Sequence, residues 1–150
     1  MKIAMISFTG NGRRLERSLA HELEKEGHQV LQAVKCKELE SDKDAVKCSA
    51  GEWTGEQFRT RDVRIFIGAV QIAVRLIASF IGSKTTDPAV LVLDEKGQYC
   101  IPILSGHIGG ANEMAERIAE MAGALPVITT ATDIRGKWAI DVFARRIIFI

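Results

Sequence analysis

A glycine-rich segment carries the side chains best suited to chemistry. Residues 105–112 have the sequence Ser-Gly-His-Ile-Gly-Gly-Ala-Asn and join an apolar strand pattern to a helix pattern. Glycines let backbone N–H groups approach an anion, and the start of a helix adds about half a positive charge. His107 can transfer a proton near neutral pH, and Ser105 can form a hydrogen bond beside it. The segment therefore predicts proton transfer next to a site for a carboxylate, a phosphate or a developing oxyanion.

The same residues allow a purely structural interpretation. Ser105 and Asn112 can cap the turn and the helix, while His107 bonds to a backbone carbonyl. A mononucleotide is not the first choice of ligand, because the segment lacks both the G-x-G-x-x-G spacing and a following Lys-Ser/Thr pair. An anion- or nucleotide-binding regulatory domain remains an alternative function.

Two other loops could contact a ligand. Residues 129–133, Thr-Thr-Ala-Thr-Asp, place three hydroxyls and one carboxylate after a predicted strand. Residues 9–12, Thr-Gly-Asn-Gly, form a tight turn before a predicted helix. Ordinary turn formation explains both loops equally well, since Asn, Asp and Thr bond to nearby backbone and Gly accepts positive φ.

Apolar runs and helical periodicity indicate the elements that position these loops. Leu15, Leu19 and Leu23 recur on one face of the first helix, and Gly27 ends it. We expect strands at residues 2–8, 28–34, 63–67, 89–93, 99–104 and 126–129, and helices at residues 13–26, 54–61, 69–81, 112–122 and 140–147.

The order of these elements predicts the architecture. A strand, helix and strand at the start form a right-handed parallel βαβ unit. The two strands around residues 94–98 form a β-hairpin, which makes the sheet mixed. We therefore expect an α/β fold, a three-layer α/β/α sandwich with a mostly parallel sheet. It divides into residues 1–68 and 69–150, or forms one continuous compact unit.

The predicted helix at residues 69–81 is apolar nearly all round, so we expect it to be buried on most sides. Arg75 is its single charge. A buried arginine needs a partner, either a protein carboxylate such as Asp87 or Asp94, or a carboxylate of a bound ligand.

Composition narrows the class of ligand and the setting. The 150 residues include 20 basic and 19 acidic side chains and are 47% hydrophobic. This balance favours a small ligand over nucleic acid or a membrane surface. The sequence has no signal-peptide or transmembrane pattern, so we expect a cytoplasmic protein. Its three cysteines, Cys36, Cys48 and Cys100, are widely spaced and suit free thiols in a reducing compartment better than disulfides or a metal site.

Residues 85–112 combine into one long signature, Thr-Thr-Asp-Pro-Ala-Val-Leu-Val-Leu-Asp-Glu-Lys-Gly-Gln-Tyr-Cys-Ile-Pro-Ile-Leu-Ser-Gly-His-Ile-Gly-Gly-Ala-Asn. It resembles the central signature of the CbiG family of the anaerobic cobalamin (vitamin B12) pathway. The resemblance is weakest over residues 35–61. Flanking matches are Asn11-Gly12, residues 66–69 with Ile72, Val74 and Arg75, and residues 126–133.

Two features depart from the family pattern. Gln71 stands where the family usually has a glycine, before the helix that contains Arg75. Complete family members also have a further carboxyl-terminal domain, which this chain of 150 residues does not include. The resemblance therefore covers the family's amino-terminal and central regions.

The resemblance implies a hydrolase that opens the δ-lactone of cobalt-precorrin-5A and expels a two-carbon fragment as acetaldehyde, giving cobalt-precorrin-5B. From this chemistry we predict that His107 activates water, oriented by Ser105, while amides near Gly109 and Gly110 hold the oxyanion. Cobalt would arrive within the substrate, so no cofactor and no protein-bound metal are expected. The predicted substrate contacts are Asn11, Gly68, Arg75, Gly106, Gly109, Gly110, Asn112, Thr129, Thr130, Thr132 and Asp133.

The resemblance leaves a second function open. The chain could be a non-catalytic tetrapyrrole-binding subunit that completes its site with a separate carboxyl-terminal partner. The apolar residues 147–150, Ile-Ile-Phe-Ile, suit either such a partner interface, self-association or a core-packed terminus.

Overall fold

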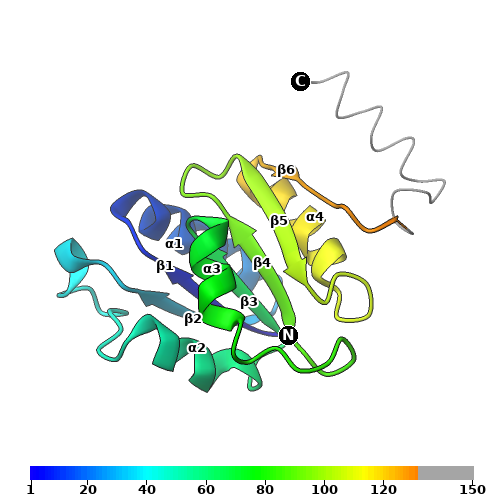
Figure 1. The fold of residues 1–150 in the computed structure, drawn as a ribbon. Helices are drawn as coiled ribbons and strands as arrows, with labels where there is room; N and C mark the ends of the chain where they lie inside the picture. Colours follow the sequence, from blue (N-terminus) through cyan, green and yellow to red (C-terminus); the bar gives the residue numbers. More distant parts are fainter. Residues whose placement is uncertain (132–150) are drawn as a thin grey trace.

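The computed structural model describes residues 1–131, which form one six-stranded sheet flanked by helices (Figure 1). The helix predicted at residues 140–147, Thr132, Asp133 and the apolar residues 147–150 lie outside this range. The elements are β1 (Lys2–Ser7), α1 (Gly10–Lys25), β2 (Gln29–Val34), a 3₁₀ turn (Lys37–Leu39), α2 (Ala50–Phe58), β3 (Val63–Ile67), α3 (Val70–Ile77), β4 (Ala89–Leu93), β5 (Tyr99–Leu104), α4 (Ala111–Ala122) and β6 (Leu125–Pro126).

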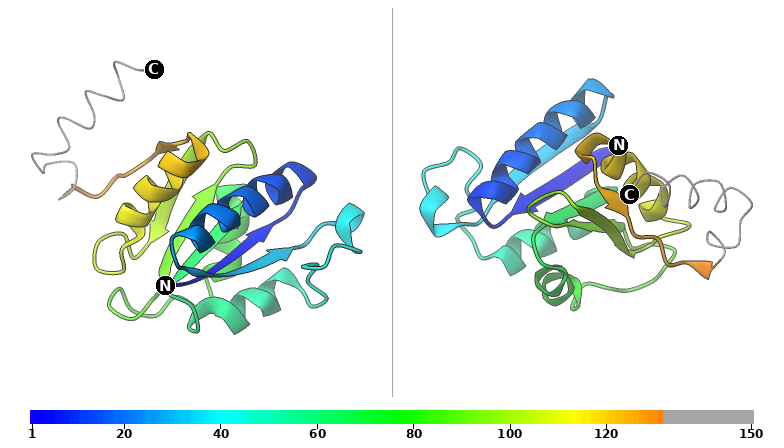
Figure 2. Two further views of the ribbon diagram at one scale, coloured as in Figure 1. Left: turned by 180° about the vertical axis from the view of Figure 1, so that it is seen from behind. Right: turned by 90° about the horizontal axis from the view of Figure 1, so that it is seen from above.

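The predicted three-layer sandwich with a mixed, mostly parallel sheet is confirmed. The strand order is β2-β1-β3-β4-β5-β6, and only the β4–β5 pair is antiparallel. Helices α1 and α4 cover one face of the sheet, while α2 and α3 cover the other, as the view from above shows (Figure 2). Each face has its own apolar core, because the alternating side chains of the central strands point to opposite layers.

The two central strands are buried along their whole length. Every residue of β3 and β4 is buried, as expected for strands that have helices on both faces and neighbours on both sides. Their near-continuous apolar sequences are consistent with this burial. Arg64 in β3 is the exception to the pattern, and it is fully buried as well.

The hairpin determines where the loops lie. Strands β1 to β4 end at one edge of the sheet, whereas β5 and β6 run the opposite way and end at the other edge. The turn after β1 and Gly68 after β3 therefore lie at one edge. The glycine-rich segment after β5 lies at the opposite edge, beside the start of β4.

Two helices begin earlier than predicted because polar side chains cap them. Thr9 accepts a hydrogen bond from the amide of Gly12 at 3.0 Å, so α1 begins at Gly10. Ser49 accepts one from the amide of Glu52 at 3.1 Å, so α2 begins at Ala50. Side-chain caps of this kind satisfy amides that have no partner within the helix.

The prediction that residues 69–81 are buried on most sides is wrong. Helix α3 is shorter, and only Ala73 and Ile77 within it are buried. Ile72 and Val74 are 38% and 48% exposed, because α3 lies on the sheet with one face and nothing in residues 1–131 packs on its outer side. No helix in this range is long and apolar enough to cross a bilayer.

Candidate functional site

The glycine-rich segment folds back on itself between β5 and α4. The amide of Ala111 donates to the carbonyl of Ser105 at 3.1 Å, and the amide of Asn112 donates to the carbonyl of Gly106 at 2.9 Å. The amide of Gly110 donates to the carbonyl of His107 at 3.3 Å, a long hydrogen bond. Three of the segment's amides are therefore committed to closing the turn in this conformation.

Steric contacts explain why glycine occupies this turn. A Cβ on Gly109 would lie 2.4 Å from the Cβ of Ser105 and 2.8 Å from its carbonyl oxygen. A Cβ on Gly106 would lie 2.8 Å from Oδ1 of Asn112. Ser105 itself has a φ of 57°, a left-handed conformation that non-glycine residues adopt rarely and often near functional sites. Packing thus accounts for both glycines, whether or not the turn also binds a ligand.

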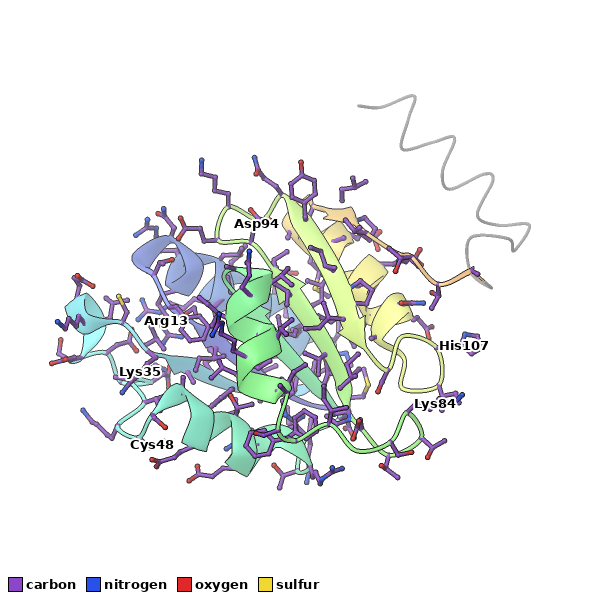
Figure 3. All side chains as sticks on the ribbon, viewed as in Figure 1. Arg13, Lys35, Cys48, Lys84, Asp94 and His107 are labelled. Carbon is purple, nitrogen blue, oxygen red and sulfur yellow. The ribbon has the colours of Figure 1, made fainter. Side chains whose placement is uncertain are left out.

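The two predicted catalytic side chains, those of Ser105 and His107, have different surroundings. The hydroxyl of Ser105 donates to the backbone carbonyl of Asp87 at 3.0 Å, which ties the turn to the segment before β4. His107 is exposed at the outer end of the turn (Figure 3). The structure therefore gives Ser105 an anchoring contact and leaves His107 accessible to a bound molecule.

Residues 129–130 join the glycine-rich turn, as the candidate site required. Nδ2 of Asn112 donates to Oγ1 of Thr130 at 2.5 Å, and Asn112 is buried. Strands β5 and β6 are parallel neighbours, so the loops that follow them meet at the same edge of the sheet. Thr129 is exposed beside this contact.

A pocket of about 480 Å³ borders this turn. Its lining includes Gly109, Gly110, Glu113 and Arg117 from the turn and α4, and Met1 and His28 from the start of β1 and β2. The α-amino group of Met1 donates to Nδ1 of His28 at 3.1 Å. The volume is in the range of small-molecule sites. His28 could not be placed here from the sequence, because its position depends on the neighbouring starts of β1 and β2.

The remaining predicted contacts lie elsewhere. Asn11 is exposed in the first turn of α1, and the amide of Gly68 donates to the carbonyl of Leu93, so both lie at the opposite edge of the sheet. Arg75 is exposed on α3 and needs no buried partner. A five-residue strand separates the edges by roughly 17 Å. The predicted substrate contacts thus fall into two groups.

The carboxylates expected to pair with Arg75 have other partners. The two carboxylate oxygens of Asp87 share one bifurcated hydrogen bond from the amide of Gly82, and Asp87 forms an ion pair with Arg59 at 3.5 Å. Asp94 accepts from backbone amides within the β4–β5 turn. An ion pair of Arg75 with Asp87 or Asp94 was expected only if Arg75 were buried, and this condition is not met because Arg75 is exposed on α3.

A buried ionic network at the end of β1 was not predicted. Arg13 is 3% exposed and donates to Glu16 at 3.1 Å, to Asp42 at 2.9 and 3.1 Å, and to Asp44 at 2.6 Å. Glu16 is fully buried and also accepts from the hydroxyl of Ser7. Burial raises the pKa of Glu16 to about 7, although Ser7, a backbone amide and Arg13 oppose the rise. The Arg-x-x-Glu spacing at residues 13–16 was the available signal.

Arg64 is the second charged residue that sequence patterns missed. Its three guanidinium nitrogens are buried, and none has a hydrogen-bond partner in the described part of the chain. The group lies 5.9 Å from the ring centroid of Phe58, and burial lowers its pKa to about 10. Among residues 1–131, no group of three or more His, Cys, Asp or Glu side chains is arranged to hold a metal ion.

The molecule is an α/β domain with an open sheet, and its polar, glycine-rich turn and adjoining pocket lie where open α/β sheets commonly bind small molecules. The family model described as cobalamin synthesis G, N-terminal, matches residues 52–133, more than half of the chain. The chain belongs to this family.

Relatives of known name support the same grouping. The chain is 52% identical over 89 residues to a cobalt-precorrin-5A hydrolase from Salmonella typhimurium, covering 59% of the chain and 25% of that protein. It is 46% identical over 91 residues to a cobalt-precorrin-5A hydrolase from Priestia megaterium, covering 61% and 24%. The chain therefore spans about a quarter of the length of these relatives.

The fold also has a solved counterpart. A cobalamin biosynthesis protein G homolog from Sulfolobus solfataricus superposes with a TM-score of 0.70 and 25% sequence identity. The match covers 85% of this chain and 36% of the other.

Proposed function

We propose that this chain acts in cobalamin biosynthesis, in the hydrolysis of the δ-lactone of cobalt-precorrin-5A, which releases acetaldehyde and gives cobalt-precorrin-5B. The observation that carries the proposal is the 52% identity over 89 residues to a cobalt-precorrin-5A hydrolase. The family match over residues 52–133 includes the glycine-rich turn and Thr130, which contacts it through Asn112.

The proposed catalytic site consists of the glycine-rich turn with residues 129–130. His107 takes a proton from water, which attacks the lactone carbonyl. Ser105 keeps the turn in place through the carbonyl of Asp87. The amide of Gly109 donates to the oxyanion, and the amide of Gly110 joins it by exchanging its long bond to the His107 carbonyl.

Substrate recognition in this proposal uses the polar groups around the turn. The hydroxyls of Thr129 and Thr130 bind carboxylate side chains of the macrocycle, and Asn112 positions Thr130. Thr132 and Asp133, which lie outside the described residues, are kept as proposed contacts. Asn11, Gly68 and Arg75 lie at the other edge or on α3, so we leave them outside the catalytic site. Cobalt belongs to the substrate, and the proposal needs no cofactor of the protein's own.

Site variants test these assignments. Turnover of cobalt-precorrin-5A is followed by acetaldehyde release and by product mass, with His107→Ala compared with His21→Ala. His21 is exposed on α1 and does not line the pocket beside the turn, so its variant is the matched control. We expect a 100-fold or larger loss for His107→Ala, of the order of general acid–base catalysis, and no loss for His21→Ala. Equal activity of the two variants would remove His107 from the mechanism.

One observation favours a second function. Because the chain spans only about a quarter of its curated relatives, it could bind the substrate while the remaining part of such a protein completes the active site. Adding the carboxyl-terminal part of the Priestia megaterium protein separates the two functions. Turnover that appears only in the mixture supports the binding subunit, whereas turnover by the chain alone supports the hydrolase.

A further inference from the structure

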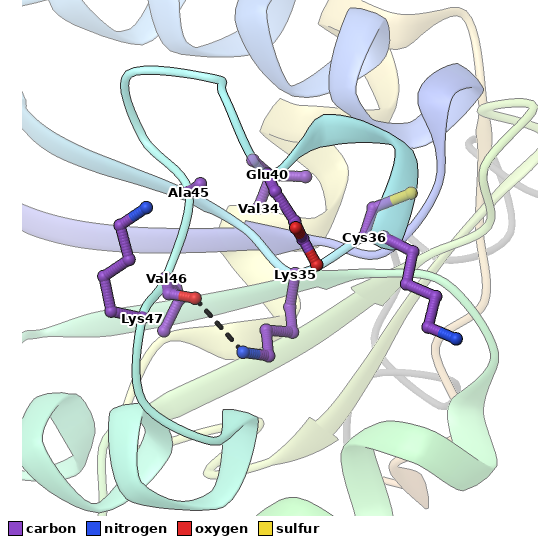
Figure 4. Close-up of a pocket in the computed structure, with 8 residues that line it drawn as sticks. Val34, Lys35, Cys36, Glu40, Ala45, Val46 and Lys47 are labelled. Carbon is purple, nitrogen blue, oxygen red and sulfur yellow. Dashed lines mark hydrogen bonds between the residues drawn. The ribbon is translucent and has the colours of Figure 1, made fainter.

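A second pocket, of about 440 Å³, lies where β2 ends (Figure 4). The end of β2 lies on the far side of the sheet from the segment between β5 and α4 (Figure 1). It is formed entirely by residues 34–47, which precede the family match. Its charged lining consists of Lys35, Lys37 and Lys47, with Glu40 as the one carboxylate. The pocket therefore has an excess of positive charge.

The loop around this pocket directs two of its carboxylates and its lysines to different sides. Its inner carboxylates, Asp42 and Asp44, turn toward the buried guanidinium of Arg13. The three pocket lysines have no carboxylate oxygen within 4.0 Å of their ammonium groups among the described residues. The lysines are left to face solvent and the pocket, although acidic residues are as frequent as basic ones in residues 35–47.

The walls of the pocket are held in place before any ligand binds. The amide of Val34 donates to the carbonyl of Asp44 at 3.0 Å, and the amide of Val46 donates back to the carbonyl of Val34 at 2.9 Å. Arg13 also holds the loop in place, because it donates hydrogen bonds to Asp42 and Asp44. Such preorganisation lowers the cost of binding, because the loop need not be ordered by the ligand.

The placement of the ammonium groups indicates the kind of ligand. Lys35 reaches across the pocket to the carbonyl of Val46 at 3.2 Å, whereas Lys47 extends away on another side (Figure 4). The side chains of Lys35 and Lys47 therefore do not converge on one point (Figure 4). A single small anion would contact only one of them. A molecule with carboxylates on separate arms could pair with several.

We propose that this pocket binds a polycarboxylate, with Lys35, Lys37 and Lys47 each pairing with a different carboxylate. The thiol of Cys36 takes no covalent part, because it donates to Glu38, and this hydrogen bond raises its pKa. If the proposed function holds, the carboxylates are those on the rim of the corrinoid substrate. That last step rests on the proposed function, whereas the lysine pocket does not.

Three probes distinguish binding of any polycarboxylate in this pocket from binding of the corrinoid substrate. Butane-1,2,3,4-tetracarboxylate tests the pocket alone. Cobyrinic acid carries free carboxylates on a corrin ring, and cobinamide carries amides in their place. Dissociation constants are measured by calorimetry at low salt, and the site is located from amide chemical shifts by NMR.

The double variant Lys37→Met/Lys47→Met is compared with Lys25→Met/Lys96→Met, which changes the net charge equally at exposed positions outside the pocket. Lys35 is kept, since it also supports the carbonyl of Val46. We expect the pocket variant to weaken tetracarboxylate and cobyrinic acid binding by about four- to twentyfold, with two exposed ion pairs lost, and the control by less than about twofold. Shifts should be centred on residues 34–47.

Two results would contradict binding of a polycarboxylate in this pocket. One is equal affinity of the two double variants for the tetracarboxylate, and the other is a set of tetracarboxylate-induced amide chemical shift changes centred outside residues 34–47. Inorganic phosphate binding as tightly as the tetracarboxylate would overturn the assignment to polycarboxylates. Lysine-dependent binding of the tetracarboxylate but not of cobyrinic acid would uphold the pocket and reject the corrinoid as its ligand. Absence of turnover in the hydrolase assay changes none of these results, so the failure of one proposal is distinguishable from that of the other.

Discussion

Replacing Arg13 by methionine removes one cation from three carboxylates. Arg13 is almost completely buried and makes hydrogen bonds to Glu16, Asp42 and Asp44. The variant leaves these acids close together, with Glu16 fully buried and Asp42 nearly so. Removing one partner of a buried ionic network costs about 3–5 kcal/mol. We expect the free energy of unfolding to fall by this amount, which lowers the melting temperature by roughly 6–20 °C for a domain of this size.

The control for this variant lies one helical turn away. Arg17 also pairs with Asp42, at 2.8 Å, but its side chain is 57% exposed. Arg17→Met should cost no more than about 1 kcal/mol. Urea unfolding of both variants at pH 7 measures the difference, and the loss for Arg13→Met should shrink at acidic pH as the carboxylates become protonated. Equal losses for the two variants would refute the view that Arg13 is the buried centre of the network.

Three other substitutions have expected outcomes in the same unfolding assay. Gly109→Ala should lower the free energy of unfolding by about 1–3 kcal/mol, since its Cβ would lie 2.4 Å from the Cβ of Ser105. Gly51→Ala is the control and should be neutral or stabilising, because no neighbouring atom would lie closer than 3.9 Å to its Cβ. Similar values for the two variants would contradict the tight turn. The pKa of Glu16 is raised in the folded chain, so the unfolded chain loses this proton at a lower pH. As the pH rises from 4.5 to 7, the free energy of unfolding of the wild type should therefore fall relative to that of Glu16→Gln, by up to about 3 kcal/mol. Parallel pH profiles of the two proteins would contradict the raised pKa. Arg64→Met should leave stability unchanged or raise it, because it removes a buried guanidinium without a hydrogen-bond partner, and a loss above about 1 kcal/mol would reveal a partner.

Local patterns predicted the strands well because burial on both faces demands continuous apolar runs. Strand β3 was predicted with its observed bounds, and β4 likewise. Helix starts were less accurate, since Thr9 and Ser49 were not recognised as caps. The burial of α3 was overestimated because an apolar sequence does not reveal whether a second layer covers it.

The candidate site depended more on topology than on residue type. The predicted hairpin already implied that β5 runs against β4, so that the glycine-rich turn and Gly68 lie at opposite edges. The contact of Asn112 with Thr130 was not predicted, because it depends on the parallel pairing of β5 with β6. The burial of Arg13 was not predicted either, because it depends on Asp42 and Asp44, which lie in a segment without periodicity.

The most direct test of the proposed function is to incubate the purified chain with cobalt-precorrin-5A in water enriched in ¹⁸O. Attack of water on the lactone carbonyl should release acetaldehyde and place one ¹⁸O atom in the new carboxylate of the product, which mass spectrometry detects. Release of no acetaldehyde, or a product carboxylate without the label, would contradict hydrolysis of the lactone by this chain.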